Sequence, residues 1–503
     1  MVIVYHEDNK VVEIDCLGKS KASMQENIVK TLFEVAVDYQ DCLIIWCHIQ
    51  LKAKLNIKGF KEIFHHPKIM ASYNPSVNCF LSELIGYVEG SPFLKINKKN
   101  TYPTWLMSGV VGGVQASVLN ILKDEIQKDR NFDYFLHSFA KLAMQNGLFC
   151  YSEPNLVKNC LEVTQKNNSS LFNLFRFVKQ HYKIQWSFFL FFNMIVYERK
   201  APILPLLNSF FYRRRKLNPN LLEKIEVKSR NKIIELETID VIIPTIGRKE
   251  YLYDVLKDLS IQTHLPANVI IVEQNSNPDS ISELDYLFNE FWPFKIKHTF
   301  VHQVGACNAR NLAIKEVGSE WTFLADDDIR FDENLLKSVL SNLKKYGANC
   351  LTTSCLKENE RQDFKIIHQS GIFGSGNSVV KSQFLKLISF NKALEFGYGE
   401  DIDFGMQLRN LGIDIIYFPR LRILHLKAPI GGFRNKFIFP WELKGENPNP
   451  SPTVMHVKIN HLTKQQLKRY KIILFLKLHK VNFFAVNRFT ISWNLSVKWS
   501  KKI

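Results

Sequence analysis

From residue 239 to about residue 427, short apolar runs alternate with amphipathic stretches at the spacing of strand–helix–strand units. Residues 239–243 predict a strand that Pro244 ends, residues 251–261 a helix, and residues 268–273 a second strand. Strands joined by crossover helices run parallel, and such sheets bind ligands beyond the carboxyl ends of their strands. The C-terminal half is therefore expected to form a mostly parallel α/β sheet with its site at that edge.

One of these strand ends is acidic. After an expected strand at 295–300 and a helix at 308–317, residues 321–324 predict a strand that ends in Asp326, Asp327 and Asp328. Three adjacent carboxylates repel one another, and a hard divalent cation such as Mg²⁺ or Mn²⁺ that bridges to substrate phosphates would offset their charge. The alternative is an acidic turn that caps the next helix, which is expected near Glu333.

Three further polar segments occupy corresponding places in the pattern. The first strand ends in the sequence VIIPTIGR (241–248), the second in IIVEQNS (270–276), and GACNARN (305–311) opens a helix. In this order and spacing the segments resemble the family-2 glycosyltransferases of the GT-A fold, whose usual forms are a PTxxR-like turn, a VDNGS-like turn, a GxxxARN helix start and a DxD motif. The resemblance covers roughly residues 240–434, less than half of the chain.

The resemblance implies roles for the side chains at these turns. The residues expected to bind the donor are Pro244, Thr245, Arg248, Glu273, Asn275, Arg310 and Asp327. Arg310, close to a helix N-terminus, would add positive charge beside a diphosphate. Glu273 and Asn275 would contact the nucleobase, although the family usually has Asp at the position of Glu273.

The metal motif can be read in two registers. It falls either on Asp326 and Asp328, or one residue earlier with Ala325 in place of the first acid. We expect Asp328 to be the direct ligand, Asp326 to lie nearby and Asp327 to face the ribose, although Asp327 and Asp328 could exchange roles. In many relatives a histidine after a later strand completes the metal site, which implies His425 here; a structural histidine is the alternative.

The acceptor side and the base follow in the next segments. The turn 374–377, with Gly376 and Asn377, resembles the small-residue turn beside the acceptor, and residues 431–434 resemble a loop that closes over the donor. Glu400 and Asp401 lie between glycines and a helical stretch, where the family keeps its general base. Inversion requires a carboxylate opposite the leaving group, and we expect Asp401 in that role with Glu400 orienting the acceptor. A helix cap with an acidic first turn is the alternative.

The rest of the chain is expected to form three further parts. Residues 1–155 show a second α/β pattern, with a strand at 42–49 and a helix at 114–128, and loosely resemble a glycosyltransferase-like accessory domain without transfer activity. Residues 156–235 read as a helical connector, 236–455 as the catalytic domain and 456–503 as a basic, aromatic tail. The tail holds 11 Lys or Arg and no acids, which predicts contact with an anionic membrane surface; a helix packed on the catalytic domain is the alternative.

Charge and cysteine content bear on partners and location. The net charge of +18 favours an anionic partner. The nine cysteines are odd in number, scattered and without a CxxC pair, which suits a reducing cytosol. No signal peptide is recognised, and the longest apolar run, 186–197, has about half of the roughly 20 residues that a spanning helix needs. A cytoplasmic location, with peripheral attachment to the inner face of the cell membrane, is expected.

Together these features predict a metal-dependent, inverting glycosyltransferase. It would move a sugar from a nucleoside-diphosphate donor, such as a UDP-sugar, to a hydroxyl of a glycan or lipid-linked acceptor in surface polysaccharide biosynthesis. Two other classes compete with this prediction. A non-catalytic nucleotide-sugar binder would carry the same donor motifs, and a nucleic-acid-binding protein would share the positive charge, but no recognisable nucleic-acid module supports the latter.

Overall fold

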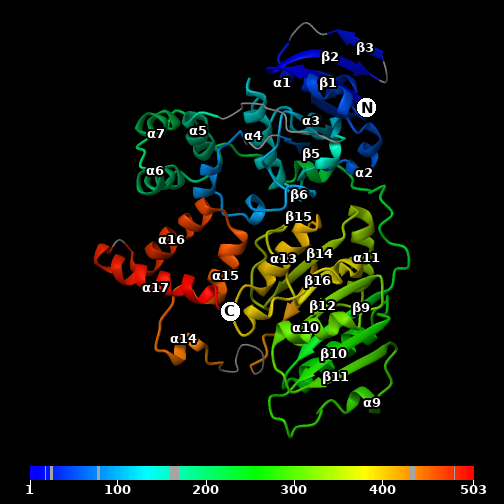
Figure 1. Cartoon of the computed structure of the whole chain (residues 1–503). Coiled ribbons are helices and arrows are strands. Elements are labelled where there is room, and N and C mark those ends of the chain that lie inside the picture. The colour runs from blue at the N-terminus through cyan, green and yellow to red at the C-terminus, as the bar shows by residue number, and fades with distance from the viewer. Residues whose placement is uncertain (17–18, 23–25, 76–79, 159–168, 430–436, 481) are drawn as a thin grey trace. The chain divides into compact units, whose positions relative to one another are not determined.

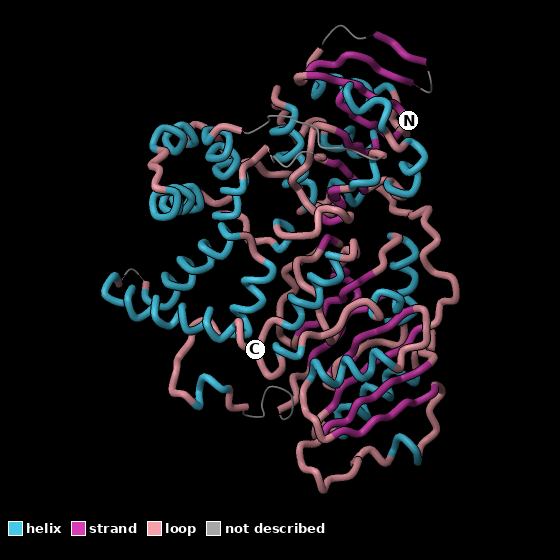
Figure 2. Tube along the Cα trace, viewed as in Figure 1, coloured by secondary structure: helices cyan, strands magenta, loops and turns pink. Residues whose placement is uncertain are grey.

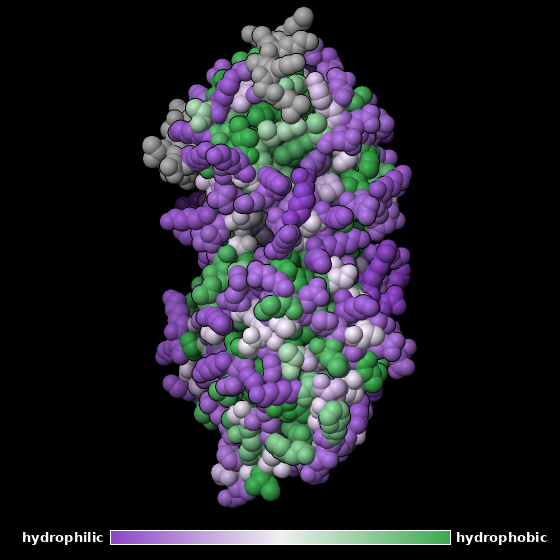
Figure 3. Space-filling model, turned by 90° about the vertical axis from the view of Figure 1, so that its right-hand side faces the viewer, coloured by the Kyte–Doolittle hydropathy of each residue, from purple (hydrophilic) through white to green (hydrophobic). Residues whose placement is uncertain are grey.

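The computed structural model describes all residues except 17–18, 23–25, 76–79, 159–168, 430–436 and 481. The expected donor-side loop 431–434 lies outside the described residues. The chain forms two compact units, residues 1–231 with 462–472 and residues 232–461 with 473–503. Each unit contains one sheet with helices packed on it (Figures 1 and 2). Hydrophilic residues are spread over both units on the face shown in Figure 3.

The sheet of the second unit is mixed, with its parallel strands grouped together. Its strands lie in the order β11 (Lys295–Val301), β10 (Asn268–Gln274), β9 (Ile239–Thr245), β12 (Trp321–Ala325), β16 (Asn377–Lys381), β14 (Cys350–Leu356), β17 (Ile416–His425) and β13 (Ile329–Arg330), and β15 (His368–Gln369) pairs with β17. The first four are mutually parallel, whereas β16 runs antiparallel to both of its neighbours. The predicted α/β class and mostly parallel sheet are therefore confirmed.

The apolar strands become buried because helices cover them. Ile242, Ile270 and Leu324 are fully buried and pack in one core with residues of α10 (Ala306–Lys315) and α13 (Glu400–Asn410). Other helices of this unit are α8 (Lys249–Ser260), which follows β9, and α11 (Leu335–Tyr346), which follows β13. The helices and strands predicted between residues 239 and 324 are found, and their ends lie at most two residues from the predicted ones.

The sequence predicted that Pro244 would end β9, and this prediction is wrong. The strand continues to Thr245, with Pro244 opposite Val272 of β10. The ladder between β9 and β12 has already stopped at the pair Ile242–Leu324. Since only one side of β9 is paired beyond that point, the missing N–H of Pro244 breaks no hydrogen bond, which is the situation in which a strand tolerates proline.

A buried carboxylate in β9 fixes the turn that leads into β12. Asp240 is fully buried and accepts hydrogen bonds from the backbone N–H groups of Gly318 (2.8 Å) and Ser319 (3.0 Å), from Ser319 Oγ (2.6 Å) and from Asn268 Nδ2 (2.6 Å). Asp240→Ala is expected to lower the free energy of unfolding by about 3 kcal/mol, because it leaves several buried donors without an acceptor. Differential scanning calorimetry measures the shift. The exposed Asp279→Ala serves as control, and an equally small change in both variants would contradict the role.

The first unit contains its own mixed sheet. Its strands lie in the order β3 (Lys19–Ala22), β2 (Lys10–Cys16), β1 (Val2–Glu7), β4 (Leu43–His48), β7 (Val111–Gln115), β5 (Ile69–Tyr73), β8 (Phe149–Ser152) and β6 (Tyr102–Pro103). The helix predicted at 114–128 begins later, because residues 111–115 form β7 and α3 (Ala116–Leu122) follows it. Gly112 does not break this strand: a Cβ there would lie 2.3 Å from the Trp46 ring, so the bare backbone is what fits beside β4.

The two sheets share a common arrangement of five strands. Five strands of each sheet have the same order along the chain, the same neighbours and the same relative directions. They are β1, β4, β5, β7 and β8 in the first sheet and β9, β12, β14, β16 and β17 in the second. In both sheets a helix starts directly after the central antiparallel strand, α3 after β7 and α12 (Ser382–Leu385) after β16. The outer strands differ: β10 and β11 run parallel to β9, whereas the hairpin β2–β3 extends β1 antiparallel.

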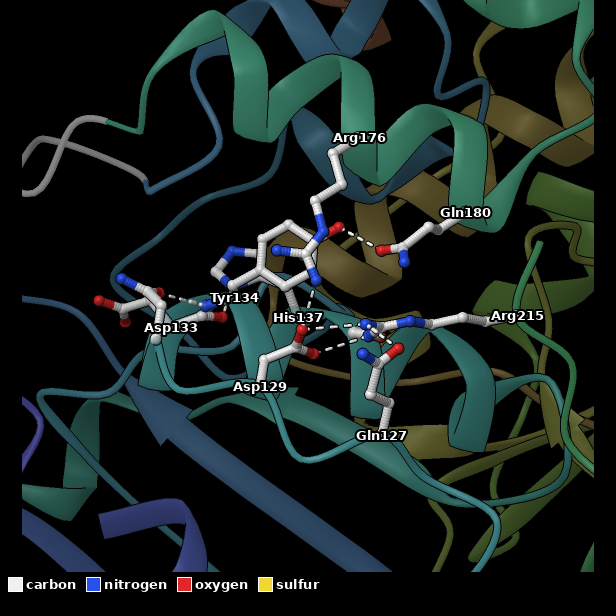
Figure 4. Close-up of polar contacts among 10 residues, drawn as sticks. Gln127, Asp129, Asp133, Tyr134, His137, Arg176, Gln180 and Arg215 are labelled. Carbon is white, nitrogen blue, oxygen red and sulfur yellow. Dashed lines mark hydrogen bonds and ion pairs between the residues drawn. The ribbon is translucent and has the colours of Figure 1, made fainter. Parts of the chain in front are cut away.

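The segment expected as a helical connector, 156–235, packs largely into the first unit. Its helices are α5 (Leu171–His181), α6 (Gln185–Glu198) and α7 (Ile203–Ser209), and Phe175, Phe177 and Leu190 belong to the same core as the sheet. A buried ionic cluster completes the attachment (Figure 4). Asp129 accepts hydrogen bonds from Arg176 of α5 (2.6 Å) and from Arg215 (2.7 and 2.9 Å), and thereby holds both ends of the helical segment.

The tail, expected as a separate segment from residue 456, is divided between the units. α15 (Pro452–His461) and α17 (Val486–Ser500) pack against each other in the second unit, and Phe489, Trp493 and Trp499 are buried there. The first half of α16 (Lys464–His479) belongs to the first unit. In that half the buried Gln466 Nε2 donates hydrogen bonds to the carbonyl oxygens of Ser91 (2.8 Å) and Glu89 (3.2 Å).

Candidate active site

The acidic triplet follows β12 at the carboxyl edge of the parallel strands. Its three carboxylates have different surroundings. The Asp327 side chain is 4% exposed and accepts hydrogen bonds from Thr245 Oγ1 (2.7 Å) and Arg248 Nη1 (2.5 Å). Burial outweighs these contacts and raises the pKa of Asp327 to about 6. The three residues therefore link the ends of β9 and β12, and the motif positions of Thr245, Arg248 and Asp327 come together as predicted.

Asp328 faces His425 at the end of β17. Its Oδ1 lies 3.4 Å from His425 Nε2, its Oδ2 accepts a hydrogen bond from the backbone N–H of Ala428 (2.9 Å), and Arg248 Nη1 is 3.3 Å away. Burial alone would raise the pKa of Asp328, but these contacts lower it, so the carboxylate is held ionised. The pair brings together an anionic oxygen and an imidazole nitrogen from strands far apart in the sequence.

Asp328 and His425 fit a divalent cation in part. Carboxylate and imidazole are ligands of Mn²⁺ and related metals. Among the described residues no group of three or more His, Cys, Asp or Glu side chains is arranged to enclose an ion. Two protein ligands leave most positions for water and for diphosphate oxygens, which is how Mg²⁺ usually binds at phosphate-transfer sites. These two ligands, Asp328 and His425, therefore suit a cation that binds together with a diphosphate.

Asp326 faces in another direction, toward Arg310. Arg310 Nη2 donates a hydrogen bond to Asp326 Oδ1 (2.8 Å), and the guanidinium carbon lies 5.5 Å from the centre of the Phe390 ring. The arginine is 6% exposed, and its Nε is buried without a hydrogen-bond partner among the described residues. Burial opposes its charge, but the carboxylates of Asp326, Asp401 and Glu400 raise the pKa of Arg310. A buried donor without a partner is uncommon and is what a polar ligand would satisfy.

The Glu400–Asp401 pair begins α13, on the other side of Arg310. Ser375 N–H donates a hydrogen bond to Asp401 Oδ1 (3.1 Å), and Gly399 N–H donates one to Glu400 Oε2 (3.0 Å). Burial, together with the Asp401 charge, raises the pKa of Glu400 to about 7. Burial also raises the pKa of Asp401, against the effect of Ser375 and Arg310. Two neighbouring carboxylates with raised pKa values are typical of proton-transfer sites.

The turn expected beside the acceptor has a steric reason for its glycine. A Cβ on Gly376 would lie 2.0 Å from Asp326 Oδ2, so any side chain there would displace the carboxylate that pairs with Arg310. Asn377, the other residue expected beside the acceptor, has a contact within the sheet. Its Nδ2 donates a hydrogen bond to the Thr353 carbonyl (2.6 Å) and so ties β16 to β14 within the sheet.

The residues predicted to contact the nucleobase lie at and just after the end of β10. Of these, Glu273 is held by three partners within the protein. Its carboxylate accepts hydrogen bonds from Ser282 Oγ (2.5 Å) and Glu283 N–H (3.0 Å) and lies 2.9 Å from His298 Nε2. Burial raises the pKa of Glu273, but these partners lower it overall. Glu273 therefore holds the loop after β10. Asn275, the next candidate, closes a turn by accepting the Asn277 N–H at 3.0 Å and is only partly buried.

The backbone N–H groups at the start of α10 are bound by a carboxylate of the protein. Glu395 accepts hydrogen bonds from the backbone N–H groups of Cys307 and Asn308, both at 2.9 Å. The carboxylate lies against Gly305, whose φ of +141° and missing side chain leave it room. Glu395 thus caps the helix that carries Arg310, and the anion at this helix end belongs to the protein itself.

Sequence reasoning also missed α15, which packs against the segment that carries Glu400 and Asp401. Thr453 Oγ1 accepts the Tyr398 N–H (3.3 Å), and His461 Nε2 lies 2.7 Å from Asp403 Oδ1. Thr453 and Val457 pack where side chains at Gly397 and Gly399 would otherwise lie. No short motif marks these partners, since they are separated from the Glu400–Asp401 pair by more than 50 residues.

An open cavity of about 630 Å³ lies beside His425. It is lined by Lys357, Glu358, Asn359, Glu360, Leu424, His425, Leu426 and Lys427. Two lysines and two glutamates line this cavity, so their charges offset one another. The cavity is large enough for a small ligand and adjoins the Asp328–His425 pair.

Several known proteins are similar to this chain. Two uncharacterized glycosyltransferases, of Rickettsia conorii and Rickettsia felis, are 32% and 30% identical over 140 residues, which is 28% of this chain and 22% of each relative. The aligned segment thus spans about a fifth of the length of these curated relatives. A crystal structure of S. aureus TarS 1–349 in complex with UDP-GlcNAc matches with a TM-score of 0.36 and 15% identity, over 52% of this chain and 78% of that chain.

A second solved structure is the mannosyltransferase PcManGT from Pyrobaculum calidifontis, in complex with GDP-Man and Mn²⁺. It matches with a TM-score of 0.33 and 14% identity, over 52% of this chain and 83% of PcManGT. The model of the family described as Glycosyl transferase family 2 matches residues 240–399, the segment that contains the four motifs and ends directly before α13. Residues 240–399 are therefore similar to the family-2 glycosyltransferases, as the motifs predict.

Proposed function

We propose that the second unit is a metal-dependent, inverting glycosyltransferase that moves a sugar from a nucleoside-diphosphate donor to a hydroxyl acceptor. The observation that carries the proposal is the position of Arg310. It pairs with Asp326 of the acidic triplet and also interacts with the charges of Glu400 and Asp401. A buried guanidinium between a phosphate-binding edge and a pair of carboxylates with raised pKa values suits a reaction with a departing diphosphate and a proton acceptor.

In the proposed reaction the Asp401 carboxylate accepts the proton of the acceptor hydroxyl. The acceptor oxygen forms a bond to the anomeric carbon while the bond from that carbon to the diphosphate oxygen breaks. The electron pair of the broken bond stays on the diphosphate, whose added charge Arg310 stabilises. Displacement from the face opposite the leaving group inverts the configuration, and no covalent enzyme intermediate is needed.

Asp328 and His425 are the proposed metal ligands, and Glu400 is proposed to orient the acceptor. A divalent cation bound there would neutralise part of the diphosphate charge. Asp327 remains engaged with Arg248 and Thr245, which keeps the phosphate-side turn of β9 next to the triplet. Asp328 faces His425 and is held ionised, whereas burial raises the pKa of Asp327 to about 6, so the surroundings favour Asp328 as the direct ligand.

The donor class and the acceptor class rest on different grounds. The family match supports a nucleotide-sugar donor such as a UDP-sugar, and the cavity beside His425 offers room for part of it. A glycan or lipid-linked acceptor in surface polysaccharide biosynthesis, at the inner face of the cell membrane, is proposed from the resemblance alone. Nucleic acid is not proposed as a partner.

The first unit is proposed to be an accessory domain without transfer activity. By strand pairing, the residue that follows Cys47 in β4 corresponds to the one that follows Ala325 in β12. His48 therefore stands where the second unit has Asp326, and the next two residues are Ile49 and Gln50. The strands that correspond to β10 and β11 are replaced by the β2–β3 hairpin. A sheet with neither the acidic triplet nor the donor-side strands retains no equivalent of the proposed site.

Incubation of the full chain with a panel of nucleoside-diphosphate sugars tests the function. With Mn²⁺ present, one donor is expected to raise the melting temperature and to be hydrolysed slowly, with release of the nucleoside diphosphate. A non-catalytic binder would show the thermal shift without release. No shift and no release with any donor, together with salt-sensitive binding to DNA, would contradict the proposal.

A further inference from the structure

A group of exposed apolar side chains lies on two consecutive helices of the first unit. In this helical pair, α6 and α7 with their flanking residues, ten large apolar side chains are between 38% and 86% exposed. They are Ile184, Phe188, Phe192, Ile195, Val196, Ile203, Leu204, Leu207, Phe210 and Phe211. Isolated exposed apolar residues are common on protein surfaces, whereas a contiguous group marks a site of interaction.

The spacing of these residues places them on one face of each helix. In α6 the residues Ile184, Phe188 and Phe192 recur every four positions, which is one side of an α-helix. The opposite side, with Leu190 and Met194, packs into the core of the first unit. The same division holds for α7, whose Leu206 is buried while Leu204 and Leu207 are exposed.

The two apolar faces form a single surface. α6 and α7 pack against each other, as Figure 1 also shows. Across the pair, the rings of Phe188 and Phe210 lie 5.6 Å apart. Phe211, at the end of α7, is the most exposed of the ten at 86%. The surface therefore extends over both helices and onto the turn after α7.

Basic side chains surround this apolar surface. Lys183 precedes α6, Arg199 and Lys200 occupy the turn between the helices, and Arg213, Arg214 and Lys216 follow α7; all six are exposed. The single acid between residues 183 and 216 is Glu198, which accepts hydrogen bonds from Tyr87 and from Lys468 (3.4 Å). The rim is thus positively charged, since the one acid of the segment is engaged by Tyr87 and Lys468.

We infer that this surface docks onto an anionic membrane. Apolar side chains flanked by Lys and Arg suit a helix that lies in the membrane plane, with its apolar face in the headgroup boundary and its cations against lipid phosphates. The helices do not suit a spanning role, since α6 has 14 residues and no helix among those described is long and apolar enough to cross a bilayer. The inference concerns the first unit and does not depend on the chemistry of the second.

The charge pattern argues against a second copy of the chain as the occupant. A twofold interface would place the same surface of two copies face to face. The basic rims, with Arg213 and Arg214, would then approach each other and repel. A lipid surface instead supplies negative charge at the rim and apolar contact at the centre.

Flotation of the full-length protein with lipid vesicles tests the inference. The wild-type protein is expected to bind vesicles of phosphatidylcholine with phosphatidylglycerol and to bind pure phosphatidylcholine weakly. Leu204→Ser and Phe211→Ser should each reduce binding by about ten-fold, because each removes a large apolar contact. Arg213→Glu combined with Arg214→Glu should reduce binding to the anionic vesicles and remove most of its dependence on salt.

Matched controls separate this surface from other exposed aromatic residues. Phe484 in the tail is 99% exposed and Phe291 in the second unit is 91% exposed. Phe484→Ser and Phe291→Ser should bind vesicles like the wild type. Thermal shifts with the donor should be the same in all variants, since none lies in the proposed site, so a failed transferase assay and a failed flotation assay remain distinct results.

Three outcomes would overturn the inference. One is equal vesicle binding by Leu204→Ser, Phe211→Ser and the wild type. Another is a loss of binding in Phe484→Ser as large as in Phe211→Ser, which would assign the membrane contact to the tail. The third is a wild-type dimer in light scattering that Phe211→Ser converts to a monomer, without vesicle binding by either protein, which would assign the surface to a second copy of the chain.

Discussion

Replacing Asp401 by Asn is expected to reduce sugar transfer by about 10²–10⁴-fold, the usual effect of losing a general base. Asn has the same shape and can still accept the Ser375 N–H at its oxygen, so the start of α13 should keep its conformation. Donor binding should persist, because the proposed donor contacts lie on β9, β12 and α10. The measurements are the transfer rate at saturating donor and the donor dissociation constant.

The pH dependence of transfer gives a second readout for the same residue. Asp401 must be ionised to accept a proton, and burial raises its pKa above the ordinary range of an aspartic acid. The rate should therefore fall as the pH is lowered through this raised pKa, with Glu400 taking up a proton near its pKa of about 7. Asp363→Asn, which removes an exposed carboxylate elsewhere in the unit, is the control. Near-normal turnover by Asp401→Asn would assign the base to another group.

Replacing Asp328 by Ala is expected to abolish the Mn²⁺-dependent part of donor binding. The loss should exceed the roughly 10–100-fold that removal of an outer-shell partner costs in metal affinity, because Asp328 is proposed as a direct ligand. His425→Ala should weaken binding less, since the anionic ligand would remain. Calorimetry of nucleoside-diphosphate binding, with Mn²⁺ and with EDTA, measures both effects.

A control for Asp328→Ala must separate metal binding from folding. The substitution also removes the acceptor of the Ala428 N–H and a partner of Arg248, so each variant should be compared by its melting temperature without ligand. Asp332→Ala, a nearby substitution beyond the triplet, should retain Mn²⁺-dependent binding. If the wild-type protein binds the nucleoside diphosphate equally well in EDTA, the triplet is a structural turn.

The parallel part of the second sheet could be predicted from sequence because its strands are apolar runs bounded by polar ends. β10, β11 and β12 begin at the predicted residues, and each ends one residue later. The prediction that Pro244 ends β9 failed, because a proline removes a hydrogen bond only where the strand has a neighbour on that side. Whether β9 has a neighbour beside Pro244 depends on how far β12 extends, and no residue near Pro244 determines that.

The sequence predicted that segment 156–235 is helical, but it could not show that the segment packs into the first unit. Its basic patch at 213–216 looks like a solvated linker, yet Arg215 is the partner of Asp129, which lies 86 residues earlier in the chain. A buried ion pair of this kind depends on two distant residues at once, and a local pattern of hydrophobicity carries no record of it.

The site shows the same division between local and distant information. Motifs identified the side chains at strand ends, and the structure brings Thr245, Arg248 and Asp327 together as they predict. Motifs could not assign partners: Glu273 is held by His298, and α10 is capped by Glu395. Each of these partners comes from a segment that the chain reaches only after one or more further elements.

The late segment 462–472 delays the completion of the first unit in a growing chain. Domains at the start of a chain generally fold first during synthesis, but the first unit here lacks Gln466 until the ribosome has translated residues 232–461. Until then the carbonyl oxygens of Glu89 and Ser91, which Gln466 later caps, must stay hydrated. The sheet of the second unit emerges complete before that moment. A nascent chain arrested ahead of residue 462 would therefore hold a finished second sheet and an unfinished first unit.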